Sequence, residues 1–344
     1  MTRHILISLL VNAGDVIMMT SALDLMRREL PSDTRLGVLL RPESFEILDG
    51  NPLVDEIIVY PYRSGSPFFG LRQVRRQIKA GKYDYFLALD RRPRGAMAAL
   101  LSGIKKRVGP SLLFAGNRPE WWTRFLFSRT VRIQPAECAG SQVSVFQTVV
   151  KRAFNIKGRG RISLPPLTSE KRSWASEVLP HAQGPTIGLC VRTNAEVKTW
   201  PAAGFAGLID KLYRGLSAGI YITGGPEDVE YIDHLLKMTH AVPVVNLAGK
   251  TRLMDIQALA FASDLFIGLD NATAHLAANS GLDKIICLLL ATKPEIIVDS
   301  MPKAKFISLT KLENRTPLTE GELIKNEIEI VYQAVAEMLS KRND

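Results

Sequence analysis

An acid, an amide and a histidine follow an apolar stretch in the second half of the chain, as Asp270, Asn271 and His275. The stretch before them, Leu265–Leu269, has the composition of a buried parallel strand, and the alanine-rich residues after them favour a helix. A strand that leads directly into a helix places backbone N–H groups at the carboxyl edge of a sheet, where Ala272 would let a phosphate approach. The stretch predicts an anion-binding turn, and an ordinary capped helix is the alternative.

A carboxylate stands in a similar place in the first half of the chain. Asp15 follows Gly14 at the end of the β-rich run Ile5–Val11 and precedes a helical pattern, Val16–Leu30. From the residues alone, the favoured role for Asp15 is to cap the following helix. A carboxylate at this position could also take a proton as a general base, and Asp90 is the next candidate. The fingerprint G-x-G-x-x-G is missing from this turn, which argues against a Rossmann-type dehydrogenase.

Basic residues on predicted loops supply further candidates for anion binding. Lys198 lies in a loop before a helix, and its positive charge suits a phosphate group, although a solvated lysine is the alternative. Arg63, Arg91 and Arg94 lie on loops after strands of the first half and could bind phosphates of an acceptor. The sequence contains no Asp-x-Asp pair, which holds a divalent ion in many transferases. We therefore expect no metal ion and no cofactor, with lysine and backbone N–H groups in the place of the metal.

Strands alternate with helices along both halves of the chain, a pattern that predicts an α/β fold with a parallel sheet in each half. Residues 157–166 are rich in Gly and Pro and form the candidate linker. The predicted domains are residues 1–165 and residues 166–344, and a long amphipathic helix at 320–340 closes the second. We expect the two Rossmann-like domains to face each other across a cleft that holds the substrates.

The composition is that of a soluble globular protein, with 46% hydrophobic and 23% charged residues in a chain of 344. The longest apolar runs, such as Ile285–Ala291, are too short to span a bilayer, and no signal-peptide pattern is present. Cys138, Cys190 and Cys287 show no pairing or metal-binding spacing. These features predict a cytoplasmic protein with reduced thiols.

Positive charge is concentrated in the first half of the chain. Residues 1–150 hold 21 Lys and Arg against 13 Asp and Glu, whereas residues 151–344 hold 23 against 21. A basic half suits anionic lipid or a phosphorylated substrate, and a solvated basic surface is the alternative. The sequence carries no nucleic-acid-binding motif, so we expect no nucleic acid partner. The aromatic and basic residues of 110–140 could touch a membrane, although a packed insert is the favoured interpretation.

A series of short motifs resembles glycosyltransferase family 9, the bacterial lipopolysaccharide core heptosyltransferases. The motifs are Gly14-Asp15-Val16, Asn51-Pro52, Lys198-Thr199-Trp200-Pro201, Thr223-Gly224-Gly225-Pro226-Glu227, Leu247-Ala248-Gly249-Lys250-Thr251 and Gly268-Leu269-Asp270 with His275-Leu276-Ala277-Ala278. The resemblance implies a GT-B fold and the transfer of a heptose, with inversion, from a nucleotide sugar, ADP-heptose, to the lipopolysaccharide inner core. Alternatives are another nucleotide sugar or glycan acceptor, or a non-catalytic protein that binds sugar nucleotides.

The resemblance also implies roles for individual residues. Asp15 would be the catalytic base, Lys198 would bind the donor phosphates, and Glu227 would hold the nucleoside. The partners would be a nucleotide-sugar donor, a phosphorylated lipopolysaccharide core acceptor and the cytoplasmic face of the inner membrane, where the protein would be peripheral. The residues expected to bind the donor are Thr193, Asn194, Lys198, Glu227, Asp270, Asn271, Ala272 and His275.

Overall fold

The computed structural model describes residues 3–61, 69–90, 92–112, 122–134, 138, 140–309 and 319–341. The chain divides into two compact units. The first comprises Met1–Pro166 together with Glu295–Ser300, and the second comprises Leu167–Pro294 and Met301–Asp344. The sequence predicted a similar division after residue 165, but it did not foresee that residues 295–300 belong to the first unit.

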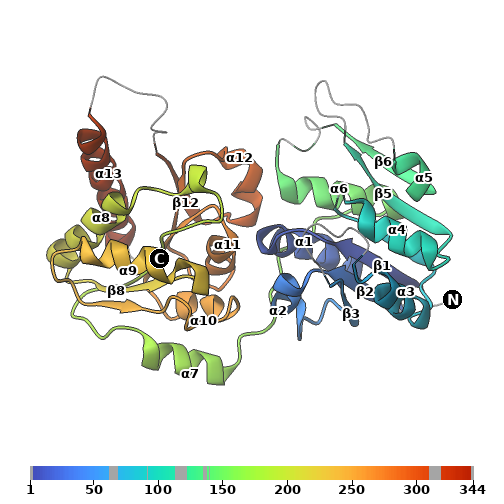
Figure 1. Cartoon of the computed structure of the whole chain (residues 1–344), viewed down its shortest axis with the longest axis horizontal. Coiled ribbons are helices and arrows are strands. Elements are labelled where there is room, and N and C mark those ends of the chain that lie inside the picture. The colour runs from blue at the N-terminus through green and yellow to red at the C-terminus, as the bar shows by residue number, and fades with distance from the viewer. Residues whose placement is uncertain are drawn as a thin grey trace. The chain divides into compact units, whose positions relative to one another are not determined.

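The first unit is built on a parallel sheet of six strands in the order β3-β2-β1-β4-β5-β6. The central strands β1, β2 and β4 consist almost entirely of buried residues, because helices cover both faces of the sheet (Figure 1). The strands are β1 (His4–Leu9), β2 (Arg35–Leu40), β3 (Glu56–Val59), β4 (Tyr85–Ala88), β5 (Lys106–Leu112) and β6 (Arg129–Ile133).

The helices of the first unit form two groups, α1 with α6 and α3 with α4 and α5. Helix α1 is apolar along most of its length, and eleven of its residues are buried, which anchors the turn that precedes it. The helices are α1 (Ala13–Glu29), η1 (Pro42–Ser44), α2 (Phe45–Leu48), α3 (Leu71–Ala80), α4 (Pro93–Leu101), α5 (Thr123–Leu126) and α6 (Gln142–Phe154).

Residues 295–300 are tied to the first unit by a partly buried polar cluster. They form most of α12 (Pro294–Ile297) and all of η5 (Val298–Ser300). The carboxylate of Asp299 accepts hydrogen bonds from Ser141 Oγ at 2.5 Å and Ser144 Oγ at 3.1 Å. Arg159 Nη2 donates to the other oxygen of Asp299 at 3.0 Å. These contacts explain why this short return of the chain belongs to the first unit.

The second unit repeats the plan with a parallel sheet in the order β12-β11-β10-β7-β8-β9. Every residue of β8, β10 and β11 is buried, as expected of central strands between two layers of helices. The strands are β7 (Thr186–Cys190), β8 (Gly219–Thr223), β9 (Val244–Asn246), β10 (Leu265–Leu269), β11 (Ile285–Leu289) and β12 (Ala304–Ser308).

The helices of the second unit also fall into two groups, α7 with α10 and α11, and α8 with α9 and α13. The long helix α13 is held by Trp200, whose fully buried indole Nε1 donates to Glu327 Oε2 at 2.7 Å. The helices are α7 (Ser169–Val178), η3 (Glu196–Lys198), α8 (Ala202–Leu216), η4 (Pro226–Asp228), α9 (Val229–Lys237), α10 (Asp255–Phe261), α11 (Ala272–Ala278) and α13 (Glu320–Ser340). The predicted α/β class and the C-terminal helix are confirmed.

Each sheet has the doubly wound order 3-2-1-4-5-6 when the strands of a unit are numbered by themselves. The strand order therefore reverses between β1 and β4 in the first unit and between β7 and β10 in the second. Loops at the carboxyl ends of the strands diverge at such a switch point and leave a crevice where ligands bind. Across the described ranges, no helix is long and apolar enough to cross a bilayer.

Candidate active site

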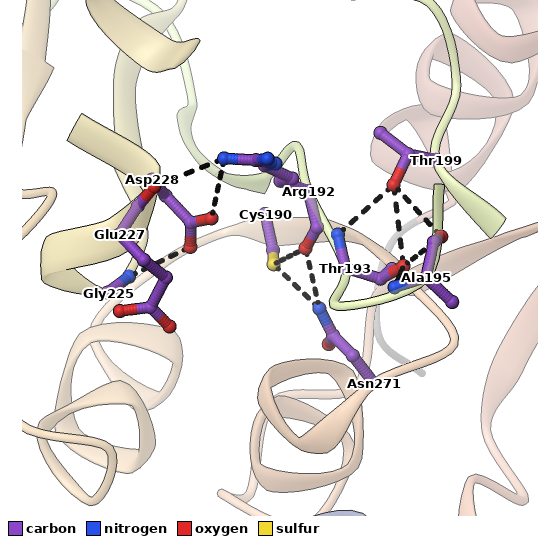
Figure 2. A network of polar contacts seen from close by, with 9 residues as sticks. All are labelled: Cys190, Arg192, Thr193, Ala195, Thr199, Gly225, Glu227, Asp228 and Asn271. Atoms are coloured by element: carbon purple, nitrogen blue, oxygen red, sulfur yellow. Dashed lines mark hydrogen bonds and ion pairs between the residues drawn. The ribbon is translucent and has the colours of Figure 1, made fainter. Parts of the chain in front are cut away.

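Asn271 joins the two loops that meet at the switch point of the second unit. As the N-cap of α11, its side-chain oxygen accepts a hydrogen bond from the N–H of Ala274 at 3.1 Å. Its amide nitrogen donates to the carbonyl of Arg192 and to the sulfur of Cys190, both at 3.0 Å (Figure 2). Asn271 thus fixes the loop after β7 against the start of α11, and the half-buried Ala272 is the first residue of that helix.

Asp270 is the centre of a charged cluster beside this bridge. Lys198 Nζ donates to the Asp270 carboxylate at 2.6 Å, and Thr292 Oγ1 donates to the same oxygen at 2.5 Å. Burial acts to raise the pKa of Asp270, but the hydrogen bonds from Lys198 and Thr292 and the charge of Lys198 outweigh it and lower the pKa below its ordinary value. Asp270 is therefore ionised at neutral pH and holds the ammonium group of Lys198 at the carboxyl edge of the sheet.

His275 lies beneath Asp270 instead of on the surface. Its side chain is only 2% exposed, and its Nε2 is 3.8 Å from Asp270 Oδ1. Burial lowers the pKa of His275 to about 4, although the charge of Asp270 acts in the opposite direction, so the imidazole is neutral at pH 7. Its burial and its distance from Asp270 favour a role in supporting that carboxylate, and direct binding of the donor by His275 stays a prediction.

The loop after β7 contains two residues that were predicted to bind the sugar donor, Thr193 and Asn194. The side chain of Thr193 forms hydrogen bonds within the loop. Thr193 Oγ1 donates to the carbonyl of Ala195 at 2.7 Å, and Thr199 Oγ1 lies 3.3 Å from the Thr193 nitrogen (Figure 2). Asn194, between them, is exposed. The hydroxyl of Thr193 therefore shapes the loop, while the side chain of Asn194 faces solvent.

Arg192 is a site residue that the sequence did not single out. Its Nη1 donates to the backbone carbonyl of Glu227 at 3.1 Å and lies 3.6 Å from Asp228 Oδ1, and its guanidinium lies 5.1 Å from the centre of the Tyr231 ring. The carboxylate of Glu227 is exposed and lies apart from this ion pair in Figure 2. Arg192 and Thr292 both lie within three residues of the end of a strand, which is the signal that could have identified them.

In the first unit, Asp15 lies in the first turn of α1, directly after the switch-point strand β1. The helix begins at Ala13, three residues earlier than the pattern indicated, so Asp15 is a helical residue and is half-buried. Asn12 occupies the N-cap position, and its side chain makes no capping hydrogen bond. The position of Asp15 is therefore compatible with a general base at the carboxyl edge of β1, and its catalytic role stays a prediction.

Asp90, the other candidate base, is enclosed in the first unit. It is 2% exposed and accepts three hydrogen bonds, from Ser8 Oγ at 2.5 Å, from the Leu10 N–H at 3.0 Å and from the Arg92 N–H at 2.7 Å. Burial raises the pKa of Asp90, against the opposing effect of these donors. Asp90 therefore holds the loops after β1 and β4 together and has no face available to a substrate.

Of the three arginines predicted to bind the acceptor, the structure describes one. Arg63 and Arg91 lie outside the described residues, whereas Arg94 lies in the first turn of α4 and lines a pocket with Arg41, Tyr60 and Arg92. Within the part of the chain that the structure describes, no group of three or more His, Cys, Asp or Glu side chains is placed to hold a metal ion.

Two doubly wound units with charged loops at their switch points define the GT-B architecture of glycosyltransferases, and solved structures share it. A family 9 glycosyltransferase of Veillonella parvula has 21% identity and a TM-score of 0.80, with 98% of this chain and 97% of that one covered. The ADP-heptose lps heptosyltransferase II of E. coli has 20% identity and a TM-score of 0.74, with 98% of both chains covered. The E. coli heptosyltransferase WaaC with ADP has 18% identity, a TM-score of 0.70 and coverage of 97% and 99%.

The sequence comparison identifies the family. The chain belongs to glycosyltransferase family 9 (heptosyltransferase), whose profile matches residues 71–325. It is also 26% identical over 276 residues to lipopolysaccharide heptosyltransferase 3 of Escherichia coli, an alignment that covers 77% of each protein. The predicted family, the GT-B fold and the classification as a glycosyltransferase are therefore confirmed.

Proposed function

We propose that this chain transfers a heptose from ADP-heptose to the inner core of lipopolysaccharide by an inverting single displacement, with Asp15 as the general base. The family match supports the reaction class. Similar structures include one named an ADP-heptose lps heptosyltransferase and one solved with ADP. The observation that carries the donor assignment is the ion pair of Lys198 and Asp270 at the switch point of the second unit. A fixed cation at this edge suits a diphosphate.

Lys198 would stabilise the negative charge that develops on the departing diphosphate. An ammonium group has three N–H donors, so Lys198 can keep its bond to Asp270 while it donates to phosphate oxygens. The ion pair with Asp270 restricts the position of the ammonium group before the donor arrives. The exposed carboxylate of Glu227 is placed to accept hydrogen bonds from ribose hydroxyl groups, and Asn194 would add a contact to the phosphates.

Asp15 would complete the reaction from the first unit. The acceptor hydroxyl attacks the anomeric carbon, its proton passes to the Asp15 carboxylate, and the bond from the anomeric carbon to the diphosphate breaks. A single displacement of this kind inverts the configuration at the anomeric carbon. Because Lys198 carries the charge that a divalent ion would supply, we propose that transfer is independent of metal ions.

We further propose that the protein acts at the cytoplasmic face of the inner membrane as a peripheral protein. Helix α3 presents Arg72, Arg75 and Arg76 to solvent, and it packs against α4, which packs against α5. Leu101 on α4 is 47% exposed and Phe125 on α5 is 69% exposed. Basic residues beside exposed apolar side chains suit an anionic lipid surface.

The decisive experiment is a transfer assay with the purified chain and a truncated lipopolysaccharide core acceptor. ADP-heptose, UDP-glucose and GDP-mannose are offered in parallel, in buffer with excess chelator, and the product is identified by mass and by the anomeric coupling in its NMR spectrum. We expect transfer from ADP-heptose with an inverted anomeric centre. Transfer from another donor would correct the sugar assignment, and retention would exclude the single displacement. Nucleotide-sugar binding without transfer or hydrolysis would favour a non-catalytic binding protein.

A further inference from the structure

We propose that the first unit contains an oxyanion pocket, formed by Tyr60, Arg41, Arg92 and Arg94, that binds a phosphate group of the acceptor. The inference rests on the proposed function for the identity of the acceptor. Of the four residues, only Arg94 was a candidate from the sequence.

The pocket lies at the switch point of the first sheet. Its lining residues come from the carboxyl ends of four adjacent strands. Leu10 follows β1, Arg41 follows β2 directly, Tyr60 follows β3 directly, and Arg92 and Arg94 lie between β4 and the first turn of α4. A doubly wound sheet binds its ligand at this edge. The second unit places Lys198 and Asp270 at the same topological position, so the pocket is the counterpart in the first unit.

The buried hydroxyl group of Tyr60 is independent evidence for a ligand-binding site. Its side chain is 2% exposed, and its hydroxyl oxygen has no hydrogen-bond partner within the described part of the protein. Buried hydroxyl groups are seldom left unsatisfied, because their desolvation is then uncompensated. Burial raises the pKa of Tyr60 above its ordinary value, although the charge of Arg94 opposes this, so the hydroxyl remains a donor at neutral pH. An oxyanion oxygen in the pocket would satisfy it.

The charges around the pocket favour an anion. Arg41 donates through Nη1 to Asn12 Oδ1 at 3.2 Å and pairs with Glu43 at 2.5 Å. Since Asn12 is the N-cap of α1, the pocket borders the positive end of a helix of 17 residues. This same helix carries Asp15 in its first turn. An anion held here would place the rest of the acceptor beside the proposed base.

The two nearby carboxylates do not cancel this attraction. The side chain of Glu43 is 56% exposed, so solvent screens its charge. Both oxygens of Asp90 are engaged by Ser8 Oγ and by the backbone N–H groups of Leu10 and Arg92. Among the described residues, three arginines thus line the pocket, and the two carboxylates near them are either hydrogen-bonded by other groups or screened by solvent.

The size of the pocket limits the ligand to a small terminal group. The cavity volume is about 10 Å³. A cavity of this volume holds about one oxygen atom, as it would hold one water molecule. The remaining atoms of a phosphate monoester would lie in the mouth, where arginines can bind them in a bidentate manner.

The test begins with inorganic phosphate as the probe. The full chain is titrated with phosphate and followed by calorimetry and ³¹P NMR, at constant ionic strength, with chloride and acetate as controls. We expect saturable phosphate binding that acetate and chloride do not reproduce. Replacement of the unpartnered hydroxyl, Tyr60→Phe, should weaken phosphate binding about tenfold or more, because one hydrogen bond to a charged group is lost. It should leave the unfolding temperature without phosphate unchanged.

Tyr83→Phe is the matched control. The hydroxyl of Tyr83, in the same unit, donates to Glu56 Oε2 at 2.6 Å, so its removal breaks an existing hydrogen bond. We expect the opposite pattern, a lower unfolding temperature with unchanged phosphate affinity. Arg94→Gln should also weaken phosphate binding and keeps the proposal testable if Tyr60→Phe alters the fold. No saturable phosphate binding, or equal affinity in the wild type, Tyr60→Phe and Arg94→Gln, would overturn the pocket.

Acceptor kinetics then separate this pocket from the transfer reaction itself. With a phosphorylated core acceptor, Tyr60→Phe should raise the acceptor KM about tenfold and leave the donor KM unchanged, and phosphatase treatment of the acceptor should abolish the difference. Displacement of phosphate by ADP would assign the pocket to the donor and overturn the acceptor assignment. Phosphate binding without any transfer would support the pocket and contradict the proposed function. Transfer with no effect of Tyr60→Phe on either KM would support the proposed function and contradict the role of the pocket in acceptor binding.

Discussion

The two units place an aspartate at the same position in the same topology, yet they use it in opposite ways. Asp90 follows β4 in the first unit, and its partners are the neutral donors of Ser8 and of two backbone N–H groups. Asp270 follows β10 in the second unit, and its partners are the cation of Lys198 and the hydroxyl of Thr292. Burial prevails for Asp90 and raises its pKa, whereas the lysine and threonine prevail for Asp270 and lower its pKa.

This difference shows what a switch point does and does not determine. The strand order brings the loops after the first and fourth strands together in both units, and it provides a crevice at that edge. In the first unit, Asp90 accepts hydrogen bonds from Ser8 and from backbone N–H groups of the loops. Arginines line the crevice there. In the second unit the acid holds a lysine, and Asn271 takes over the connection between the loops. Equivalent topology thus gives one edge that is lined by arginines and one edge at which an aspartate holds a lysine.

The largest expected effect concerns the proposed base in the first unit. Asp15→Asn should lower kcat about 10²–10⁴-fold, because the amide cannot take the acceptor proton. Donor affinity should stay within a factor of two, roughly, since the base acts mainly in the transition state. Steady-state kinetics and calorimetry with the donor measure both quantities. Glu29→Gln, an exposed acid at the end of the same helix, is the control and should leave kcat unchanged. Normal turnover of Asp15→Asn would reduce Asp15 to a helix-terminus residue.

The second effect is on stability and tests the buried histidine of the second unit. The pKa of His275 is lowered to about 4, so the unfolded chain binds a proton more readily than the folded one. Protonation therefore favours unfolding, and the free energy of unfolding should fall by about 3 kcal/mol between pH 6.5 and pH 4. The contribution of Asp270, whose pKa is lowered, is lost only below this range as the pH falls.

Denaturant titrations between pH 7 and pH 4 provide the measurement. His275→Gln should show a shallower pH dependence than the wild type by up to one proton, whatever its absolute stability. The exposed residue His181 supplies the control, because His181→Gln should leave the slope of the wild type intact. Identical slopes for the wild type and His275→Gln would contradict the prediction.

The third effect concerns the cation of the second unit. Lys198→Ala should weaken binding of the nucleotide-sugar donor by about 1.5–3 kcal/mol, since one charge-assisted contact to the diphosphate is lost. The control is Lys211→Ala, which breaks an ion pair with Glu329 between α8 and α13 in the same unit. Calorimetry with the donor should show a change only for Lys198→Ala. Equal affinities in both variants would exclude Lys198 as a phosphate ligand.

The smallest effect tests the structural role of the acid in the first unit. Asp90→Asn replaces one acceptor oxygen with an NH₂ group that must face a donor, so it should lower the free energy of unfolding by about 1–3 kcal/mol. The donor affinity should not change, because the carboxylate contacts only the loops of its own unit. Asp270→Asn makes the opposite comparison, with weaker donor binding through the loss of the Lys198 partner. If both variants changed donor affinity equally, the distinction between the two edges would be wrong.

The local pattern of the sequence determined much of the secondary structure. The predicted bounds of β10, Leu265–Leu269, agree with the structure residue for residue, because apolar composition and chain breakers act within a few residues. The pattern also predicted a helix directly after the strand Leu265–Leu269, because the residue types that begin a helix act on their immediate neighbours. The alternation of strands and helices along the chain was likewise sufficient to predict the α/β class, and the short motifs were sufficient to predict the family.

Elements with weaker local signals were missed or misplaced. β6 lies within a stretch that was interpreted as an irregular insert, and its exposed residues alternate with buried ones as in an edge strand. β12 and α7 were not predicted, since both are partly exposed and their burial depends on neighbours from elsewhere in the chain. The return of residues 295–300 to the first unit depends on Asp299 and its distant partners.

The contacts that define the two edges arise only in the tertiary structure. Lys198 and Asp270 are 72 residues apart, and Ser8 and Asp90 are 82 residues apart. The sequence placed each of the charged residues on a loop after a strand, but it could not say which loops meet, because that depends on the strand order. The opposite pKa shifts of Asp90 and Asp270 follow from this pairing, since burial and partners act through space. The sequence determined which charged residues lie on loops after strands, and the doubly wound topology decided which of those residues are in contact.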